Sequence, residues 1–540
     1  MLYYVLQFLP TVLLATPVMI WMTMNLRTAR AWRWMLVPIA LAALLGAGAV
    51  LAAFIPGVTR DGWSASRLCH AISWVNGEPL YPGDNPSHAV LVRMYGPVSA
   101  FVYLPTALAW RPTVALLAGA GINLVLLVAP TIWLMRRGNR LIGPSEWAST
   151  LAGTALLAIS VAACVFILLP TAASVTIDAP AIGFGICACA VLAGRSADSI
   201  SWRTGLLCGI FAALSIWTKQ TMAPIVLALG IYLLLLERIR ATLVMLASIA
   251  VISGLLLLAF NPRNMLFDMV TIPSRHPTHW PWMDQFSVVL RGMRMIRRDV
   301  SAVCWMLLLA IALRLFDRPR ALKLEALRDW LQRNGGWLLP LLVSLLVLPT
   351  TAMAYVKYGG GINNAAPSGY FALVAAVMAL LGTCAAGSDT PTLPVPARLG
   401  RLAMLLVIVI VPLIHHREML HTLEGLKTWS KLSDNDSEIA FRYSRQYPGE
   451  FYFPQCPLGA LMGEGKAYHF DMAILDRELA GMTISAEQLH AGIPEHMRAM
   501  FYHDLSPSGP VPKLLPQFDQ LTHPPELPGW SMLSAPDSGQ

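Results

Sequence analysis

One acidic residue follows the second apolar run of this 540-residue chain and opens the polar stretch RDGWSASRLCHAISWVNGEPLYP, residues 60–82. A carboxylate beside a hydrophobic run costs free energy unless it has a role or a partner. Asp61 is suited to accept a proton from an attacking hydroxyl. It is also suited to cap the helix that residues 61–75 predict, because Asp is favoured at the N-cap, and the residue type by itself favours this capping role. Both interpretations stay open at this point.

A second candidate site is the arginine-rich segment 261–299, which also carries His276 and His279 beside Trp280 and Trp282. Arginine binds phosphate through paired hydrogen bonds, so this segment predicts a phosphate-binding function. The histidines are weaker candidates for substrate contacts. The alternative is a basic amphipathic segment that contacts anionic lipid headgroups. The arginines concerned are Arg263, Arg275, Arg291, Arg294, Arg297 and Arg298.

Three further short segments carry polar residues between apolar runs. Asp178 ends TAASVTID, Lys219 lies at a turn between two runs, and Asn363 and Asn364 follow three consecutive glycines. The asparagines could bind sugar hydroxyls, and the glycines suit a close approach of the backbone to a ligand. Each residue also has a structural interpretation: Asp178 as a helix cap, Lys219 reaching toward headgroups, and 355–370 as a plain turn.

The composition indicates the elements that must position these residues. The chain is 56% hydrophobic and 13% charged, whereas soluble domains carry about a quarter charged residues. A membrane-spanning helix needs about 20 mostly apolar residues. We therefore predict a polytopic helix bundle of about twelve spans, at 2–24, 35–56, 113–135, 147–169, 180–194, 203–217, 221–236, 241–260, 300–316, 336–355, 369–385 and 401–416.

The basic residues predict the orientation of this bundle. If the spans alternate, clusters such as Arg136, Arg137 and Arg140 fall on one side, which is then the cytoplasm. Residues 95–110 are apolar but short and contain two prolines, so we interpret them as an interfacial helix. The outer side then holds the loops 57–112, 170–179, 218–220, 261–299 and 356–368. We predict a transmembrane domain over 1–416 and a small soluble α+β domain over 417–540 on the outer side.

The segments RDGW, NGEPLYP and YGPVSAFVYLPTALA together resemble the first outer loop of the GT-C glycosyltransferases, which use polyprenyl-phosphate sugars. TIDAPAIGFGI is similar to the second acidic loop of that superfamily, and SIWTKQTMAPIVLAL to a later turn. The resemblance implies that Asp61 is the catalytic base and supports roles for Asp178 and Lys219. Many members have two neighbouring acids where Asp61 has Arg60 and Gly62. One carboxylate holds a hard cation poorly, so we expect no metal and no other cofactor.

These observations predict an integral glycosyltransferase of a bacterial inner membrane. It would move a sugar from a polyprenyl-phosphate carrier to a periplasmic acceptor, with Asp61 as base and with Asp178, Lys219, Arg275, Arg294, Arg297 and Arg298 near the lipid phosphate. The expected partners are the lipid-linked sugar, the acceptor and membrane lipids, and no nucleic acid. A transporter or flippase of a lipid-linked sugar is one alternative. A non-catalytic scaffold that presents the tail is another.

Overall fold

The computed structural model describes residues 31–536, except 60–61, 92, 139–145, 165, 316–323, 386–398, most of 401–414, and 504–508. Two of the predictions above fall outside the described residues: the first expected span, at 2–24, and the proposed base, Asp61. Most of the last expected span, at 401–416, also lies outside them.

The described chain is mainly helical, as predicted, and each apolar run from 35–56 to 369–385 coincides with a helix, except that the run 147–169 is divided between two helices. Among the residues that the structure describes, four helical segments are long and apolar enough to cross a membrane, namely Pro112–Gly138, Ile239–Ala259, Glu325–Tyr355 and Ile362–Thr383. A total of twelve spans therefore stays a prediction. The helices of the bundle are α2 (Ala31–Thr59), α5 (Pro112–Gly138), α6 (Glu146–Ala163), α8 (Asp178–Leu192), α9 (Trp202–Thr218), α10 (Ile225–Leu235), α11 (Ile239–Ala259), α15 (Ser301–Leu315), α16 (Leu324–Tyr355) and α17 (Ala366–Ala385).

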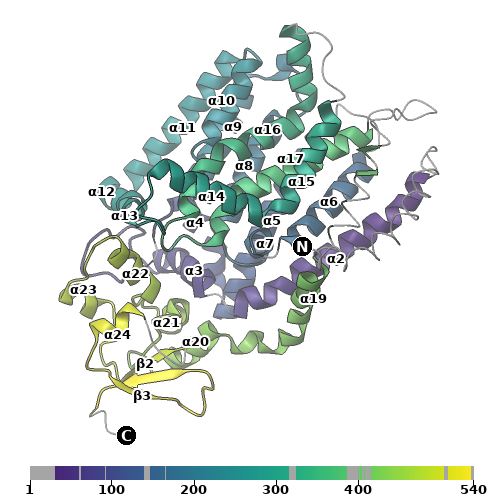
Figure 1. The fold of residues 1–540 in the computed structure, drawn as a ribbon. Helices are drawn as coiled ribbons and strands as arrows, with labels where there is room; N and C mark the ends of the chain where they lie inside the picture. Colours follow the sequence, from purple (N-terminus) through teal and green to yellow (C-terminus); the bar gives the residue numbers. More distant parts are fainter. Residues whose placement is uncertain are drawn as a thin grey trace.

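Small residues allow two helices to lie at the centre of the bundle. α8 is rich in alanine and glycine and packs against α5, α9 and α17 (Figure 1). A Cβ atom at Gly183 would lie 2.2 Å from the carbonyl oxygen of Leu126, so glycine is needed for this close packing. α17 is also buried, with Phe371 and Leu373 fully enclosed. These two helices carry site residues at or just before their N-termini, so their burial fixes those residues in place.

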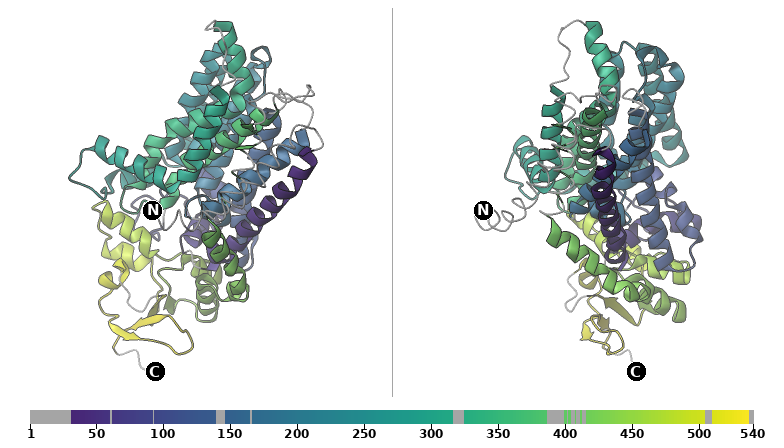
Figure 2. Two further views of the ribbon diagram at one scale, coloured as in Figure 1. Left: turned by 45° about the vertical axis from the view of Figure 1, so that its right-hand side comes forward. Right: turned by 90° about the vertical axis from the view of Figure 1, so that its right-hand side faces the viewer.

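One end of the bundle is covered by short elements, and we call it the docking end because the C-terminal segment packs there (Figures 1 and 2). Residues 95–110 form two helices of five residues each, α4 and η1, which are too short to cross a membrane. The short elements are α3 (Gly62–Val75), α4 (Pro97–Phe101), η1 (Leu104–Leu108), α7 (Leu168–Ala173), η3 (Gln220–Met222), α12 (Pro262–Leu266), η4 (Phe267–Thr271), α13 (Ile272–Arg275) and η5 (Ile362–Ala365).

The arginine-rich segment ends in the amphipathic helix α14 (Gln285–Asp299). Val288, Gly292 and Ile296 recur at every fourth position and are buried, and α14 packs along α16. A Cβ at Gly292 would lie 2.8 Å from the carbonyl oxygen of Ala352, so the two helices approach closely. The arginines of α14 therefore point away from α16.

The C-terminal segment, residues 416–536, combines helices with a four-stranded sheet of order β1-β2-β4-β3. β1 is parallel to β2, and the other two pairs are antiparallel. The rings of Phe453 and Phe501 stack with their centroids 5.1 Å apart, and Trp530 meets Phe453 edge to face at 5.7 Å. The elements are α19 (His416–Glu424), η6 (Gly425–Asp434), α20 (Asp436–Gln446), β1 (Phe451–Tyr452), α21 (Pro457–Glu464), α22 (Asp471–Leu479), α23 (Ala486–Ala491), β2 (Ala499–Tyr502), α24 (Pro510–Leu514), β3 (Gln520–Thr522) and β4 (Ser531–Ser534).

The C-terminal segment shares a hydrophobic core with the docking end. Leu68 of α3 packs in one cluster with Leu458 and Ile474. The fully buried Glu438 accepts hydrogen bonds from Arg111 Nε at 2.6 Å and from Thr113 Oγ1 at 2.9 Å. Because a buried carboxylate needs such donors, these bonds fix the segment to the start of α5.

Candidate functional site

Four residues from three segments that the sequence singled out separately meet in one buried cluster at the docking end. Lys219 Nζ donates hydrogen bonds to Asp178 Oδ1 at 2.6 Å and to Asn364 Oδ1 at 2.7 Å. Asn363 Nδ2 donates to the other Asp178 oxygen at 2.8 Å. Asp178 is 1% exposed and Lys219 is 3% exposed. We call these four residues the Asp–Lys cluster.

Local structure explains why these side chains converge. Asp178 begins α8, where the partial positive charge of the helix N-terminus favours a carboxylate. Lys219 follows the last residue of α9, where the helix carbonyls favour a cation. Asn363 and Asn364 lie in η5, just before α17. The start of α8, the end of α9 and the short helix before α17 therefore supply the cluster.

The three consecutive glycines position the asparagines. Gly359 has φ +75°, a left-handed conformation that residues with a Cβ adopt rarely. A Cβ at Gly360 would lie 2.2 Å from the carbonyl oxygen of Ala354. The glycines are thus required for the chain to turn closely from α16 into η5, which brings Asn363 and Asn364 to the Asp178–Lys219 pair.

The next residue, Gln220, joins the cluster to two outer loops. Its side-chain Nε2 donates to the carbonyl oxygens of Met94 and Met269, both at 2.8 Å. Met94 belongs to the first loop and Met269 to the arginine-rich segment. One turn of chain therefore holds the Asp–Lys cluster and both loops together.

The chain that follows Asp61 is bonded to the loop that precedes Asp178. Arg67 Nη1 donates to the carbonyl oxygen of Val175 at 2.6 Å, and the Val175 amide donates to Ser64 Oγ at 3.2 Å. α3 begins at Gly62, directly after Asp61. The first acidic loop thus lies against the second, although the Asp61 side chain itself lies outside the described residues.

The other predicted residues are dispersed around the docking end. Arg275, Arg294, Arg297 and Arg298 are exposed, and Arg298 Nε contacts Asp299 Oδ1 at 3.1 Å. Among the described residues, no hydrogen bond or ion pair joins these arginines to the Asp–Lys cluster. Within the same part of the chain, no group of three or more His, Cys, Asp or Glu side chains is arranged to hold a metal ion.

The two histidines have different surroundings. His276 is buried, and its Nε2 lies 2.9 Å from the carbonyl oxygen of Asp476 in α22. Burial lowers the pKa of His276, so the neutral ring is favoured. His279 is exposed and packs on Tyr358, with ring centroids 4.3 Å apart. His276 therefore connects the arginine-rich segment to the C-terminal segment.

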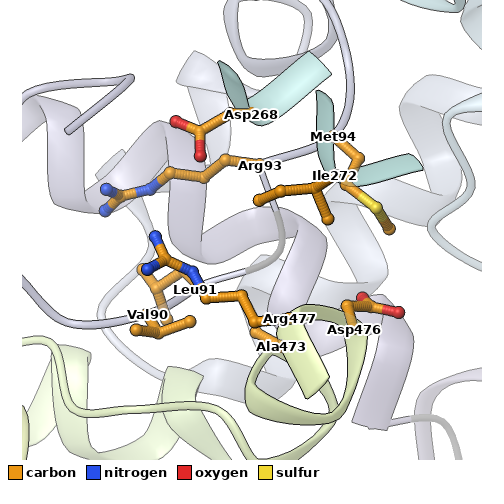
Figure 3. Close-up of a pocket in the computed structure, with 9 residues that line it drawn as sticks. All are labelled: Val90, Leu91, Arg93, Met94, Asp268, Ile272, Ala473, Asp476 and Arg477. Carbon is orange, nitrogen blue, oxygen red and sulfur yellow. The ribbon is translucent and has the colours of Figure 1, made fainter. Parts of the chain in front are cut away.

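Sequence reasoning missed a polar hollow beside the cluster, which contains Arg93, Asp268, Asp476 and Arg477 (Figure 3). These residues come from the first loop, from η4 and from α22. Arg93 was the available signal, because it is a lone charge in the apolar stretch AVLVRMYGPV. Its acidic neighbours are remote in the sequence and could not be assigned to it.

The comparisons with known proteins concern the whole chain. No family model and no curated protein matches it. The solved structure of ArnT from Cupriavidus metallidurans bound to undecaprenyl phosphate is similar, with a TM-score of 0.53 at 11% identity, over 93% of this chain and 98% of that one. The apo structure of the same ArnT gives a TM-score of 0.43 at 14% identity, over 91% and 96% of the two chains.

At 11% sequence identity, the similarity to the bound ArnT structure shows a shared fold and does not show a shared activity. ArnT is a GT-C glycosyltransferase, and its bound form superimposes along nearly the full length of both chains. The resemblance that the sequence motifs indicated is therefore confirmed at the level of architecture. This chain has the fold of the GT-C glycosyltransferases.

Proposed function

We propose that this protein is an integral membrane glycosyltransferase that moves a sugar from a polyprenyl-phosphate carrier to an acceptor outside the cytoplasm. The observation that carries the proposal is the buried Asp–Lys cluster at the docking end of a GT-C fold. The similar ArnT structure holds undecaprenyl phosphate, which belongs to the same class of lipid carrier. We place the protein in a bacterial inner membrane with the docking end in the periplasm.

In this proposal, Asp61 is the general base. It takes the proton of the acceptor hydroxyl as that oxygen bonds to the sugar carbon. The bond between the sugar carbon and the phosphate oxygen breaks, and its electron pair leaves on the lipid phosphate. Developing charge on the phosphate needs nearby donors. The exposed Arg275, Arg294, Arg297 and Arg298 supply candidate donors.

The geometry refines the role of Lys219. Two of its ammonium hydrogens are used by Asp178 and Asn364, which leaves one for a phosphate oxygen. Asp178 holds the lysine in a single orientation, and Asn363 holds Asp178. We therefore assign both asparagines to positioning the pair rather than to binding sugar hydroxyls. His276 likewise positions the C-terminal segment, whereas the exposed ring of His279 is available to a substrate.

A transporter of a lipid-linked sugar is the main alternative. Transporters place binding residues near the middle of the membrane, between repeated halves. The Asp–Lys cluster instead lies at helix ends, against the loops and close to the C-terminal segment. This placement favours chemistry at the membrane surface over passage through the bundle.

Lipid analysis of a deletion strain tests the proposal. Mass spectrometry should show accumulation of one polyprenyl-phosphate sugar and loss of that sugar from one envelope component. Wild-type protein should restore both pools, whereas Lys219→Met should not. A deletion that leaves both the carrier lipids and the envelope sugars unchanged would exclude the proposed reaction. Donor supplied from outside the cell should not restore the envelope sugar if the missing protein is a transferase. It should restore the sugar if the missing protein is a transporter.

A further inference from the structure

A long 3₁₀ helix, η6 (Gly425–Asp434), follows α19 and leads into the rest of the C-terminal segment (Figure 1). In a 3₁₀ helix, residues three apart lie on the same face. Leu426, Trp429 and Leu432 have this spacing, and we call them the η6 stripe. Leu432 is buried, whereas Leu426 is 49% exposed and Trp429 is 64% exposed. The apolar stripe therefore begins on the surface and ends in the core.

The buried end of the η6 stripe is fixed to the docking end. Leu432 belongs to the same hydrophobic cluster as Leu68 and Leu458. Its carbonyl oxygen accepts hydrogen bonds from Thr113 Oγ1 at 3.2 Å and from Asn435 Nδ2 at 2.7 Å. These contacts hold the helix in one rotation about its axis. Leu426 and Trp429 are therefore kept on the outside of the molecule.

The preceding helix, α19 (His416–Glu424), lies beside α2 at the depth of a predicted span. A Cβ at Gly48 would lie 4.0 Å from Leu423 Cδ2. Gly48 lies about 12 Å along α2 from the end of the apolar run 35–56, at the helical rise of 1.5 Å per residue. η6 also packs against α2, and its ten residues cover about 20 Å. η6 therefore passes the level at which the predicted span leaves the membrane.

The surface next to the exposed end of the η6 stripe is apolar as well. Leu420 of α19 is exposed, and so are Leu44 and Leu51 of α2. α2 packs against both α19 and η6, so the exposed leucines belong to adjoining elements. An apolar surface of this kind is costly in water and favourable in contact with lipid. Trp429 fits the same position, because tryptophan favours the interface between lipid and water.

Two lysines flank the η6 stripe, one on each side. A 3₁₀ helix has three residues per turn, so Lys427 follows the stripe on one side and Lys431 precedes it on the other. Both side chains are exposed. Lys427 Nζ lies 3.6 Å from the exposed Glu424 Oε1, and no ion pair within the described part of the chain involves Lys431. Lysines beside an apolar face are typical of helices that lie on a membrane with anionic lipids.

We propose that α19 and η6 lie in the outer surface of the membrane and bind anionic phospholipids. Leu420, Leu426 and Trp429 contact the acyl chains, and Lys427 and Lys431 contact the lipid phosphates. A lipid cover is favoured over a protein partner because the stripe continues from a helix at the depth of a span. The contact is separate from sugar transfer. It anchors the C-terminal segment to the membrane beside the docking end, and it moves the start of the soluble part from residue 417 to about residue 433.

Photocrosslinking from position 429 tests this proposal in the full-length protein. A benzophenone amino acid replaces Trp429, and the protein is placed in nanodiscs that contain equal amounts of phosphatidylglycerol and phosphatidylcholine. Mass spectrometry after irradiation should show a phospholipid adduct at position 429. Phosphatidylglycerol should exceed phosphatidylcholine in this adduct by about fivefold or more, the preference that one lysine gives at an anionic surface. The same label at the exposed Tyr447, beside β1, is the control and should give no lipid adduct.

A second pair of proteins tests the lysines. Lys427→Gln combined with Lys431→Gln should bring the ratio of the two lipids in the adduct close to one. Lys466→Gln combined with Lys513→Gln removes the same charge from exposed positions elsewhere in the segment and should leave the ratio unchanged. All four side chains are exposed, so both variants should unfold at the wild-type temperature.

Irradiation of whole cells before extraction adds the natural partners of this surface. An adduct with a protein in place of lipid would overturn the membrane assignment, and so would the absence of any lipid adduct from the folded protein. Equal adducts with the two lipids in the wild-type protein would overturn the assignment to anionic headgroups. No sugar donor takes part in these measurements, so a negative result here would leave the proposed transferase function unaffected.

Discussion

At the scale of residues, the Asp–Lys cluster is a closed network in which every member depends on another. Asp178 and Lys219 are almost fully buried and pair at 2.6 Å. Breaking a buried pair by removing one partner leaves an uncompensated charge, whereas removing both partners does not. The network therefore predicts strong coupling between the two positions.

A double-mutant cycle measures that coupling. Asp178→Asn and Lys219→Met should each lower the free energy of unfolding by about 3–5 kcal/mol. The double variant should lose clearly less than the sum, because neither charge then remains unpaired. Thermal unfolding in nanodiscs gives the comparison. If the two losses simply add, the pair does not stabilise the docking end in the way that the contacts indicate.

The pH dependence of stability reports on Asp476. Its raised pKa means that the folded protein binds this proton more tightly than the unfolded chain. The protonated carboxyl is favourable, so stability from this group is greatest at low pH and declines between about pH 4 and pH 7. Asp476→Asn cannot ionise and should raise the unfolding temperature by a few degrees at pH 8, about 2–4 °C per kcal/mol, but hardly at pH 4.

Unfolding scans of both proteins at the two pH values provide the measurement. His276 and Arg477 lie close to this carboxyl, so Asp434→Asn, at an exposed position, controls for a general change of charge. An equal shift of the unfolding temperature at both pH values would mean that ionisation of the buried Asp476 carboxyl does not destabilise the folded protein.

Residue type and spacing predicted the members of the cluster but not their association. Asp178 is 41 residues from Lys219 and 185 residues from Asn363 in the chain, and each of the three had a plausible local role as a cap, a headgroup contact or a turn. Their contact requires that the start of α8, the end of α9 and η5 lie at the same level of the bundle. That level is set by helix packing, which a pattern of apolar residues does not specify. The same reason explains why Arg93 was not connected to Asp268 and Asp476.

At the scale of elements, the glycines after α16 are the most specific requirement. Gly360→Ala would bring a Cβ within 2.2 Å of a backbone carbonyl oxygen, so the loop must shift. Because Asn363 and Asn364 follow directly, we expect this variant to lose the contacts with Asp178 and Lys219 and to lower activity along with stability.

Activity assays and thermal unfolding of Gly360→Ala should be compared with Gly121→Ala. Gly121 lies inside α5, and a Cβ there would meet nothing within 4 Å. The control should therefore be neutral or stabilising, by up to about 1 kcal/mol. Wild-type behaviour of Gly360→Ala would show that the loop does not position the cluster.

Helices were predicted well because long apolar runs are a strong signal, and ten of the expected runs coincide with helices. Breaks within runs were not predicted. The run at 147–169 is divided, since α6 ends at Ala163 and α7 begins at Leu168. Residues 95–110 form two short helices rather than one. These boundaries depend on neighbouring elements more than on local sequence.

At the scale of the whole molecule, the distribution of basic residues predicts the topology. Reporter fusions after residues 140, 240 and 330 should read cytoplasmic, and fusions at 280 and 430 should read external. An external signal at 140 would invert every later loop. It would also place the Asp–Lys cluster and the C-terminal segment on the cytoplasmic side, where a lipid-linked donor is not required.

The C-terminal segment is joined to the rest of the chain more closely than composition suggested. The change to polar composition after residue 416 indicated a separate soluble domain. In the structure, Glu438 is fixed to the start of α5, His469 accepts a hydrogen bond from the Val90 amide at 2.8 Å, and Arg477 reaches the first loop. A polar composition indicates that a segment lies outside the membrane, but it does not indicate which surface the segment packs against. The contacts with the bundle could therefore not be predicted from composition.

The central claim, that the docking end transfers a sugar with Asp61 as the base, is tested most directly by one substitution in the intact protein. Asp61→Asn keeps the size of the side chain and an oxygen that can cap a helix, so stability should change by about 1 kcal/mol or less. Asparagine cannot take the acceptor proton, so sugar transfer from a polyprenyl-phosphate donor should fall by roughly 10²–10⁴-fold. Asp198→Asn, at a side chain that is 98% exposed, is the matched control and should retain activity. An Asp61→Asn protein that folds normally and transfers sugar at the wild-type rate would contradict the account.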